Sequence, residues 1–367
     1  MTLLSRIAAP LAALSIAATA FTAPVALAAE VTPAQIAGDA PLARIAETAP
    51  PVAESDPNWR AKVQQISAEN PRVKEVQAYS PSMDRNIPMV VIKSAEHNAP
   101  TLYLLNGAGG GEQSNTDWIT QTSVVDFYLD KGINVVIPMA GAFSYYTDWV
   151  DQDLNTRYLK GPQKWETFLT KELPGPLESY FGANDKRAIA GMSMSATTSL
   201  LFAQHNQGFY DAVGSFSGCA ATSTPIPWAY LQVTVNRGGA TPEQMWGPMG
   251  GEYNRYNDAL VNADMLRGTE LYVSNGSGFA GARDMPGYYI EKGADPLVAS
   301  IGATRLQVEG GAIEAATNQC THDLKAKLDH AGIPAHFQFN NVGTHSWSYW
   351  EADLENSWPT FARGLGV

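Results

Sequence analysis

Two alternating sequence patterns from residue 76 to the C-terminus constrain the fold of this chain most. Short apolar runs rich in β-branched residues recur between longer segments whose apolar residues fall at steps of three and four. Such runs are typical of buried strands, and such steps are typical of helices. The alternation of strand-like and helix-like segments predicts an α/β fold with a mostly parallel central sheet and helices on both faces. The predicted strands are 89–92, 101–105, 134–138, 187–192, 212–217, 270–274 and 335–340, and the predicted helices are 121–131, 165–180, 195–205 and 312–331. No linker-like composition interrupts residues 76–367, which we interpret as one domain.

The N-terminus has the three parts of a secretory signal peptide. Arg6 supplies the positive charge, residues 7–21 are rich in Ala and Leu, and Ala26-Leu27-Ala28 is a small-residue cleavage site. We therefore expect residues 1–28 to be a signal peptide and residues 29–75 to be a Pro/Ala-rich N-terminal extension. No later segment reaches about eighteen uninterrupted apolar residues, so we expect no transmembrane segment in the mature chain. The predicted localisation is secreted or in the cell envelope.

The charge balance and the cysteine count narrow the possible partners and compartment. Lys and Arg number 24 and Asp and Glu number 36, which gives a net charge of −12. Without basic runs, such a chain is unsuited to binding nucleic acid. Cys219 and Cys320 are the only cysteines, and export makes a single disulfide between them possible. Two buried free thiols are the alternative, and we favour the bridge.

A candidate nucleophile lies where a predicted strand meets a predicted helix. The predicted strand 187–192 ends within Gly191-Met192-Ser193-Met194-Ser195, a G-x-S-x-S string that leads into the predicted helix. The nucleophile elbow of hydrolases usually reads G-x-S-x-G, because small neighbours let the strand and the helix approach each other. Ser195 is small enough to replace the second glycine. The alternative is an ordinary tight turn with a capping serine, but the strand-to-helix context favours Ser193 as a nucleophile.

A seryl nucleophile needs a base and an acid, which follow it in the order Ser, acid, His in this type of fold. His345 lies in a loop after the last predicted strand, where the base must come from. The other five histidines precede Ser193 or lie inside predicted helices and strands. Four carboxylates qualify as the acid by order: Asp284, Asp295, Glu309 and Glu314. Glu314 lies in the first turn of a predicted helix, where the helix dipole favours a charged carboxylate.

The oxyanion hole of such an enzyme needs two backbone N–H groups. One is expected from Met194, the residue after the nucleophile, and the other from the glycine-rich loop 106–111 that follows an early strand. This loop lacks the G-K-[ST] ending of a phosphate-binding loop, and Glu112 stands where a dinucleotide-binding motif needs glycine. We therefore expect no nucleotide.

Several longer strings identify a family. The chain resembles the secreted mycolyltransferases of the antigen 85 type and their corynebacterial relatives, which have the α/β-hydrolase fold. The resemblance covers residues 76–360. The strings that carry it are Ser80-Pro81-Ser82-Met83, Tyr103-Leu104-Leu105-Asn106-Gly107, Tyr146-Thr147-Asp148-Trp149, Lys164-Trp165-Glu166-Thr167-Phe168-Leu169-Thr170, Gly191-Met192-Ser193-Met194-Ser195, Met245-Trp246-Gly247-Pro248, and Gly343-Thr344-His345-Ser346-Trp347 followed by Tyr349-Trp350.

The resemblance implies roles for individual residues. Ser193 would be the nucleophile and His345 the general base, while Ala108 and Met194 would supply the oxyanion N–H groups. The family acid is a Glu near the start of the helix before the last strand, which implies Glu314 first and Glu309 second. The residues expected at the substrate are Asn106, Gly109, Ser346 and Trp347, where Trp347 would stack on a sugar or wall an acyl chain unless it simply packs in the core.

Two departures from the family stand out. Asn106 replaces an Asp and Gly109 replaces an Arg in the loop that binds trehalose in the family, and the loss of both charges weakens trehalose recognition by that route. Asn106 can still hydrogen-bond a sugar hydroxyl. The segment 276–308 is longer than the corresponding segment expected in the mycobacterial proteins. We expect it to shape a lid or the acceptor groove.

The activity implied by the resemblance is transfer of a mycolyl chain from trehalose monomycolate, through Ser193, to a hydroxyl acceptor. The acceptor would be a second trehalose monomycolate, cell-wall arabinan or a serine of an envelope protein. A secreted carboxylesterase or lipase that uses water is one alternative, and a non-catalytic envelope-binding protein on the same fold is another. This chemistry needs no cofactor and no metal.

Overall fold

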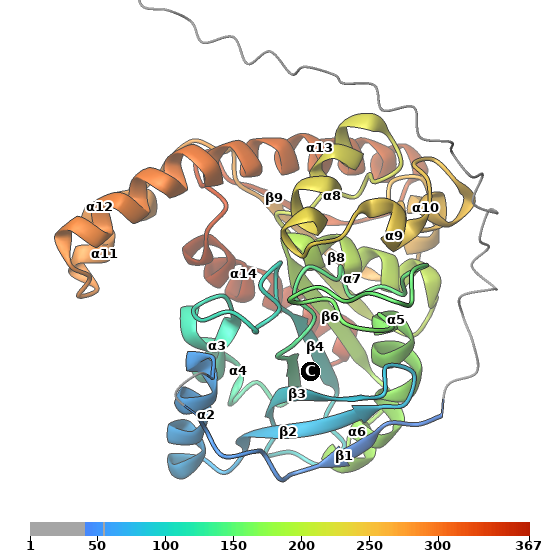
Figure 1. Cartoon of the computed structure of the whole chain (residues 1–367), viewed down its shortest axis with the longest axis vertical. Coiled ribbons are helices and arrows are strands. Elements are labelled where there is room, and N and C mark those ends of the chain that lie inside the picture. Colours follow the sequence, from blue (N-terminus) through green and yellow to red (C-terminus); the bar gives the residue numbers. More distant parts are fainter. Residues whose placement is uncertain (1–40, 54–55) are drawn as a thin grey trace, which may run out of the picture.

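The computed structural model describes residues 41–53 and 56–367 (Figure 1). The signal peptide predicted over residues 1–28 lies outside them. The described residues contain a nine-stranded sheet with the order β1-β2-β3-β5-β4-β6-β7-β8-β9. The strands are β1 (Arg44–Ala46), β2 (Val73–Ser80), β3 (Arg85–Ile92), β4 (Thr101–Leu105), β5 (Asn134–Pro138), β6 (Arg187–Met192), β7 (Ala212–Phe216), β8 (Glu270–Asn275) and β9 (His336–Phe339).

The sheet is parallel from β5 through β4, β6, β7 and β8 to β9, and antiparallel from β1 to β3 and between β3 and β5. All residues of β4, β5 and β7 are buried, as expected for parallel strands covered on both faces. The predicted α/β fold with a mostly parallel sheet is therefore confirmed. Because parallel strands end at the same edge, the loops after β6, β7, β8 and β9 lie next to one another.

Two hydrophobic cores fill the space between the sheet and its helices. Helices α2, α3, α4 and α14 bury side chains such as Trp59, Trp118 and Trp350 on one face. Helices α5 to α9 and α13 bury side chains such as Trp165 and Leu324 on the other. The helices are α2 (Asn58–Glu69), α3 (Trp118–Gln121), α4 (Val124–Tyr128), α5 (Trp165–Thr167), α6 (Pro174–Phe181), α7 (Met194–His205), α8 (Pro225–Arg237), α9 (Pro242–Trp246), α10 (Glu252–Tyr256), α11 (Pro286–Glu291), α12 (Pro296–Arg305), α13 (Gly311–Ala331) and α14 (Trp347–Leu365), with π-helical turns η1 (Phe168–Glu172) and η4 (Leu306–Gly310) and 3₁₀ turns η2 (Ala263–Leu266) and η3 (Ala282–Asp284).

Several predicted boundaries differ from the structure. β1 and α2 fall inside the range 29–75 that was interpreted as an extension, and β2 begins before residue 76. β1 is too short to give a sequence pattern, and α2 buries Trp59 and Val63 against the sheet. The single helix predicted over 165–180 is divided into α5, η1 and α6, with Pro174 at the start of α6. Helix α14 was not predicted at all, and Pro359 interrupts its pattern.

The region 276–308 projects from the body of the molecule. After β8 the chain runs out to α11 and α12 and returns through η4 into α13, so that α11 and α12 extend beyond the sheet (Figure 1). We call residues 286–310 the arm.

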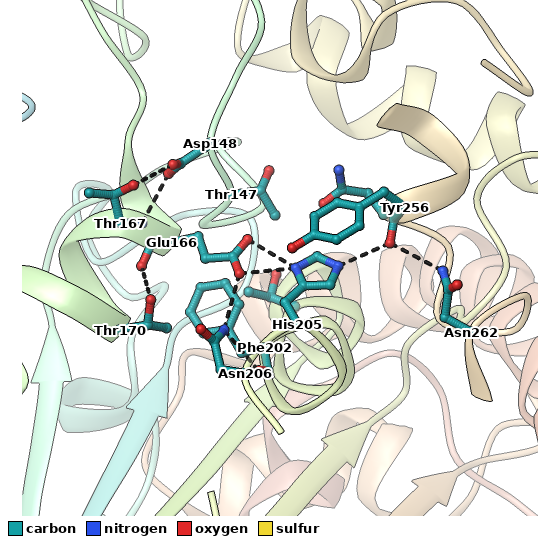
Figure 2. Close-up of polar contacts among 12 residues, drawn as sticks. Thr147, Asp148, Glu166, Thr167, Thr170, Phe202, His205, Asn206, Tyr256 and Asn262 are labelled. Carbon is teal, nitrogen blue, oxygen red and sulfur yellow. Dashed lines mark hydrogen bonds and ion pairs between the residues drawn. The ribbon is translucent and has the colours of Figure 1, made fainter. Parts of the chain in front are cut away.

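A buried polar network joins α7 to the helices beside it (Figure 2). Nδ1 of His205 lies 3.0 Å from the carboxylate of Glu166, and Nε2 lies 3.0 Å from the carbonyl oxygen of Tyr256. Both ring nitrogens therefore face acceptors, and each must carry a proton to donate. Burial lowers the pKa of His205, but the Glu166 charge and these hydrogen bonds, with a contribution from Asp148, outweigh it and raise this pKa above 6.5. Burial has the opposite effect on the nearby carboxyl of Asp148, because it disfavours the charged form of an acid, and it raises the pKa of Asp148 to about 6.

The His205–Glu166 pair should make stability depend on pH. A histidine whose pKa is raised in the folded state contributes stability that is fully present below its unfolded pKa and is lost as pH rises through the folded pKa. We therefore expect Glu166→Gln to cost about 2 kcal/mol of unfolding free energy below pH 6.5. The cost should shrink as pH rises through the folded pKa. Urea unfolding of both proteins across this pH range measures the difference, and a cost that does not change with pH would contradict the assignment.

Candidate active site

Ser193 lies at a strained turn between β6 and α7. Its φ is 58° and its ψ is −119°, a conformation that non-glycine residues rarely adopt. The turn is held by the backbone N–H of Ser193, which donates to the carbonyl of Phe216 at 2.8 Å. Gly191 is required here, because a Cβ at this position would lie 2.4 Å from the carbonyl oxygen of Ser195. The local geometry is that of a nucleophile elbow.

Ser195, which replaces the usual glycine of the elbow, is fully buried. Its Oγ accepts a hydrogen bond from the backbone N–H of Met192 at 3.0 Å and lies 3.3 Å from the carbonyl oxygen of Leu105 in β4. The hydroxyl thus ties the elbow to the neighbouring strand. The sequence pattern predicts only a small residue at position 195 and gives no sign of this contact.

Three predicted residues from three separate segments form one hydrogen-bonded chain. Nε2 of His345 lies 2.7 Å from Oγ of Ser193, and Nδ1 lies 2.8 Å from Oε2 of Glu314. Ser193 immediately precedes α7, Glu314 lies in the first turn of α13, and His345 lies in the loop after β9. The structure therefore brings together a hydroxyl, an imidazole and a carboxylate in the order that nucleophilic catalysis requires.

The Glu314 carboxylate is buried, with 1% of the residue exposed. Its Oε1 accepts hydrogen bonds from Oγ of Ser217 at 2.7 Å, Nδ2 of Asn275 at 3.0 Å and the backbone N–H of Gly276 at 2.6 Å. A buried charge needs such donors to offset its desolvation. Ser217 and Asn275 lie at the ends of β7 and β8, and no sequence motif marks either as part of the site.

The other candidate acids have different surroundings. The Glu309 side chain is 61% exposed and pairs with Arg305, while Asp295 caps the N-terminus of α12. Asp284 is buried and accepts hydrogen bonds from the hydroxyls of Thr344 at 2.6 Å and Tyr349 at 2.7 Å. Asp284 therefore holds the loop that carries His345 but does not contact the imidazole.

The ring of His345 is also held from the side of α14. Trp350 packs edge-on against it, with ring centroids 4.8 Å apart and planes at 87°. The indole N–H of Trp350 donates to Oγ of Ser217 at 3.0 Å. The hydroxyl of Ser217 thus links Trp350 to Glu314, so α14 supports both the base and the carboxylate.

The two predicted oxyanion donors come from different segments, one from the start of α7 and one from the loop after β4. Met194 is the first residue of α7, so its backbone N–H belongs to the free N-terminus of that helix. Ala108 lies in the loop after β4, and its carbonyl accepts from the backbone N–H of Phe143 at 2.9 Å. Ala108 lines the same cavities as Ser193 and His345. This arrangement suits stabilisation of a developing oxyanion.

Comparison with known proteins identifies the family. Residues 80–361 match the family described as putative esterases. The chain is 30% identical over 302 residues to the diacylglycerol acyltransferase/mycolyltransferase Ag85A of Mycobacterium tuberculosis, which covers 80% of this chain and 82% of that protein. It is also 30% identical over 302 residues to the Ag85B protein of Mycobacterium intracellulare, with 80% and 84% covered. The chain belongs to the antigen 85 type of mycolyltransferases. The family resemblance drawn from the sequence motifs is confirmed.

Solved structures agree on the fold. The structure of MPT51 from Mycobacterium tuberculosis matches with a TM-score of 0.61 at 23% identity, covering 78% of this chain and 96% of MPT51. An S-formylglutathione hydrolase from Agrobacterium tumefaciens matches with a TM-score of 0.56 at 13% identity, covering 80% and 96%. The predicted α/β-hydrolase fold is confirmed, and the protein is an enzyme of the acyltransferase or esterase type.

Two further features concern binding and membranes. Within residues 41–53 and 56–367, no group of three or more His, Cys, Asp or Glu side chains is placed to hold a metal ion. In the same part of the chain, no helix is long and apolar enough to span a membrane.

The structure explains both departures from the family loop. Asn106 is fully buried, where Nδ2 donates to the carbonyl of Pro138 at 2.9 Å and Oδ1 accepts from the backbone N–H of Trp118 at 3.1 Å. Its amide thus holds the loop and does not line the cavities at Ser193, contrary to the predicted contact with a sugar. At Gly109 a Cβ would lie 2.3 Å from Oγ1 of Thr116, so Thr116 occupies the space that an Arg side chain would need.

Two cavities meet at Ser193 and His345. An open cleft of about 720 Å³ is lined by the predicted substrate residues Gly109, Ser346 and Trp347. A second cavity of about 290 Å³ lies between α8 and α13, lined by apolar side chains that include Leu231 and Ile313. The ring of Trp347 also contacts Trp118 edge-on, with centroids 5.3 Å apart, so it belongs both to the cleft wall and to the packing of α14.

The two cysteines form a disulfide. Cys219, just after β7, is bonded to Cys320 in α13. The bridge connects the loop that carries Ser217 to the helix that carries Glu314, so it reinforces the segments around the carboxylate.

The surroundings of Glu314 and Glu309 lead to a direct test of the acid. We expect Glu314→Gln to lower kcat for ester cleavage by about 10³- to 10⁴-fold, because the amide favours the wrong tautomer and orientation of His345. Glu309→Gln is the matched control and should stay within about twofold of the wild type, since Glu309 pairs only at the surface. Steady-state cleavage of a p-nitrophenyl ester measures both. Equal activity in the two variants would exclude Glu314 as the acid.

Proposed function

We propose that this protein is an acyltransferase in which Ser193 is the nucleophile, His345 the general base and Glu314 the acid that orients it. Backbone N–H groups of Ala108 and Met194 would form the oxyanion hole. The observation that carries this proposal is the continuous hydrogen-bonded chain from Glu314 through His345 to Ser193 at the junction of two cavities.

The geometry supports a two-step reaction. Nδ1 of His345 donates to Glu314, which leaves Nε2 free to take the proton from Ser193 as its Oγ attacks the ester carbonyl. The tetrahedral oxyanion lies against the backbone N–H groups, and its collapse releases the alcohol, which takes the proton from His345. A second hydroxyl then gives its proton to His345 and attacks the acyl-enzyme, the acyl bond to Oγ of Ser193 breaks, and His345 returns the proton to Oγ.

The proposed substrates follow from the family and the cavities. The relatives are named mycolyltransferases and diacylglycerol acyltransferases. We propose trehalose monomycolate as donor and a hydroxyl of trehalose monomycolate, cell-wall arabinan or an envelope protein serine as acceptor. The smaller cavity between α8 and α13 would take the acyl chain, and the larger cleft would take the alcohol. The signal peptide of residues 1–28 would deliver the enzyme to the cell envelope.

A secreted carboxylesterase is the second candidate. The match to the putative esterase family favours it, as does the open cleft, which gives water a route to Ser193 and His345. Hydrolysis uses the same acyl-enzyme, so only the acceptor of the second step differs.

Labelling with a serine-directed phosphonate tests the nucleophile. The wild type should be labelled, and Ser193→Ala should lose the label completely because Oγ is the attacking atom. Ser195→Gly is the matched control, because it alters the neighbouring serine of the same motif to the usual glycine of the elbow. It should keep the label. Mass spectrometry of the labelled peptide locates the adduct, and an adduct on a residue other than Ser193 would contradict the assignment.

Product analysis distinguishes transfer from hydrolysis. With a trehalose monoester as the only substrate, transfer yields trehalose diester and free trehalose, whereas hydrolysis yields fatty acid and trehalose. We expect diester from the wild type and neither product from Ser193→Ala. Fatty acid as the sole acyl product would overturn the transferase proposal and leave the esterase in its place.

A further inference from the structure

The arm forms the second wall of the open cleft. On the body side the cleft is lined by Thr116, Ser193 and Trp347, and on the arm side by residues of α11, α12 and η4. The arm residues from Val298 to Leu306 that line it are 298, 299, 302, 305 and 306, which is the spacing of one helix face. One continuous face of the arm therefore lies across the cleft from the nucleophile.

Gly302 lies in the middle of this face, and the fold does not require glycine there. Its backbone is helical, and a Cβ built at this position would meet nothing within 4 Å. Glycine inside a helix is less stable than alanine because it loses more conformational freedom on folding. Neither backbone conformation nor close packing thus explains this residue. Its missing side chain leaves the cleft wider at that point.

The two cavities differ in size and in the segments that line them, which indicates what each holds. The smaller cavity between α8 and α13 is lined by apolar side chains that include Leu231, Ile313 and Ala316, which suit an alkyl chain. The open cleft has hydroxyl, amide and carboxylate groups on its body side, including Gln121 and Glu351, facing the mostly apolar arm. A sugar fits such a cleft, because its hydroxyls need polar partners and its C–H face packs on apolar surface.

We propose that the arm selects the alcohol part of the ester, both the alcohol that leaves and the hydroxyl compound that replaces it. Gly302 is the specificity-determining position, and it keeps the cleft wide enough for an alcohol of disaccharide size. This inference rests on the proposed function and assigns to the arm a role within the same site. A larger side chain at 302 narrows the alcohol subsite and leaves the acyl cavity unchanged, because α12 does not line the latter.

Two esters of the same acyl chain test the proposal, one with trehalose and one with p-nitrophenol as the alcohol. Gly302→Leu should lower kcat/KM for octanoyl trehalose by about tenfold or more. Its kcat/KM for p-nitrophenyl octanoate should stay within about twofold of the wild-type value. The matched control is Gly287→Leu on α11, because a Cβ there also meets nothing within 4 Å and Gly287 does not line the cleft. It should leave both esters unchanged. If Gly302→Leu keeps the wild-type kcat/KM for both esters, or loses activity only toward the p-nitrophenyl ester, the proposal is overturned.

A graded pair of variants covers the case in which Gly302→Leu loses both activities. In Gly302→Ala and Gly302→Val, the ratio of the two kcat/KM values should fall as the side chain grows, and a ratio independent of side-chain size overturns the role of the arm. Phosphonate labelling separates this failure from that of the proposed function. A Ser193 label with an unchanged ratio overturns the arm proposal alone, whereas an unlabelled wild type overturns both.

Discussion

The buried carboxylate of Glu314 is the interaction on which the rest of the site depends. A charge with 1% exposure is stable only if donors replace the water it has lost. Those donors come from the ends of β7 and β8 and from His345 after β9. Three neighbouring parallel strands must therefore end at the same level. The register of the sheet is in this sense part of the catalytic geometry, and the Cys219–Cys320 disulfide fixes α13 against the same edge.

Close packing around the elbow and the loop after β4 shows how the usual residues can change without loss of geometry. Ser195 stands where the general hydrolase elbow has glycine, and its hydroxyl is hydrogen-bonded to Met192 and lies 3.3 Å from the carbonyl oxygen of Leu105. Gly109 replaces an arginine, and Thr116 fills the space beside it. Asn106 is drawn into the loop by Pro138 and Trp118. The chemistry at Ser193 needs only the backbone path of this loop, so its side chains can differ where the sugar is bound.

The sequence predicted those parts of the protein that follow from local pattern. Buried parallel strands, the elbow at Ser193 and the position of His345 after the last strand could all be read from periodicity and order. Glu314 could not be separated from Glu309 by pattern, because the two lie within about one and a half turns of helix and only burial distinguishes them. Ser217 and Asn275 have no motif, since their role depends on contacts between segments distant in sequence. Helix α14 was missed because Pro359 opposes helix locally and tertiary packing of Trp350 and Phe361 overrides it.

The arm and the acid share one helical segment, which raises the question of how the arm can vary without disturbing Glu314. The answer lies at its base. A Cβ at Gly278 would lie 2.5 Å from the carbonyl oxygen of Gly311, and one at Gly311 would lie 2.7 Å from that of Gly278, so the two backbones are in direct contact. The backbone N–H of His345 also donates to the carbonyl of Gly310 at 3.1 Å. These contacts fix the start of α13 on the active-site side of the arm. Changes in α11 and α12 can therefore reshape the cleft while the carboxylate keeps its place, which allows the alcohol subsite to diverge while the nucleophile, base and acid do not.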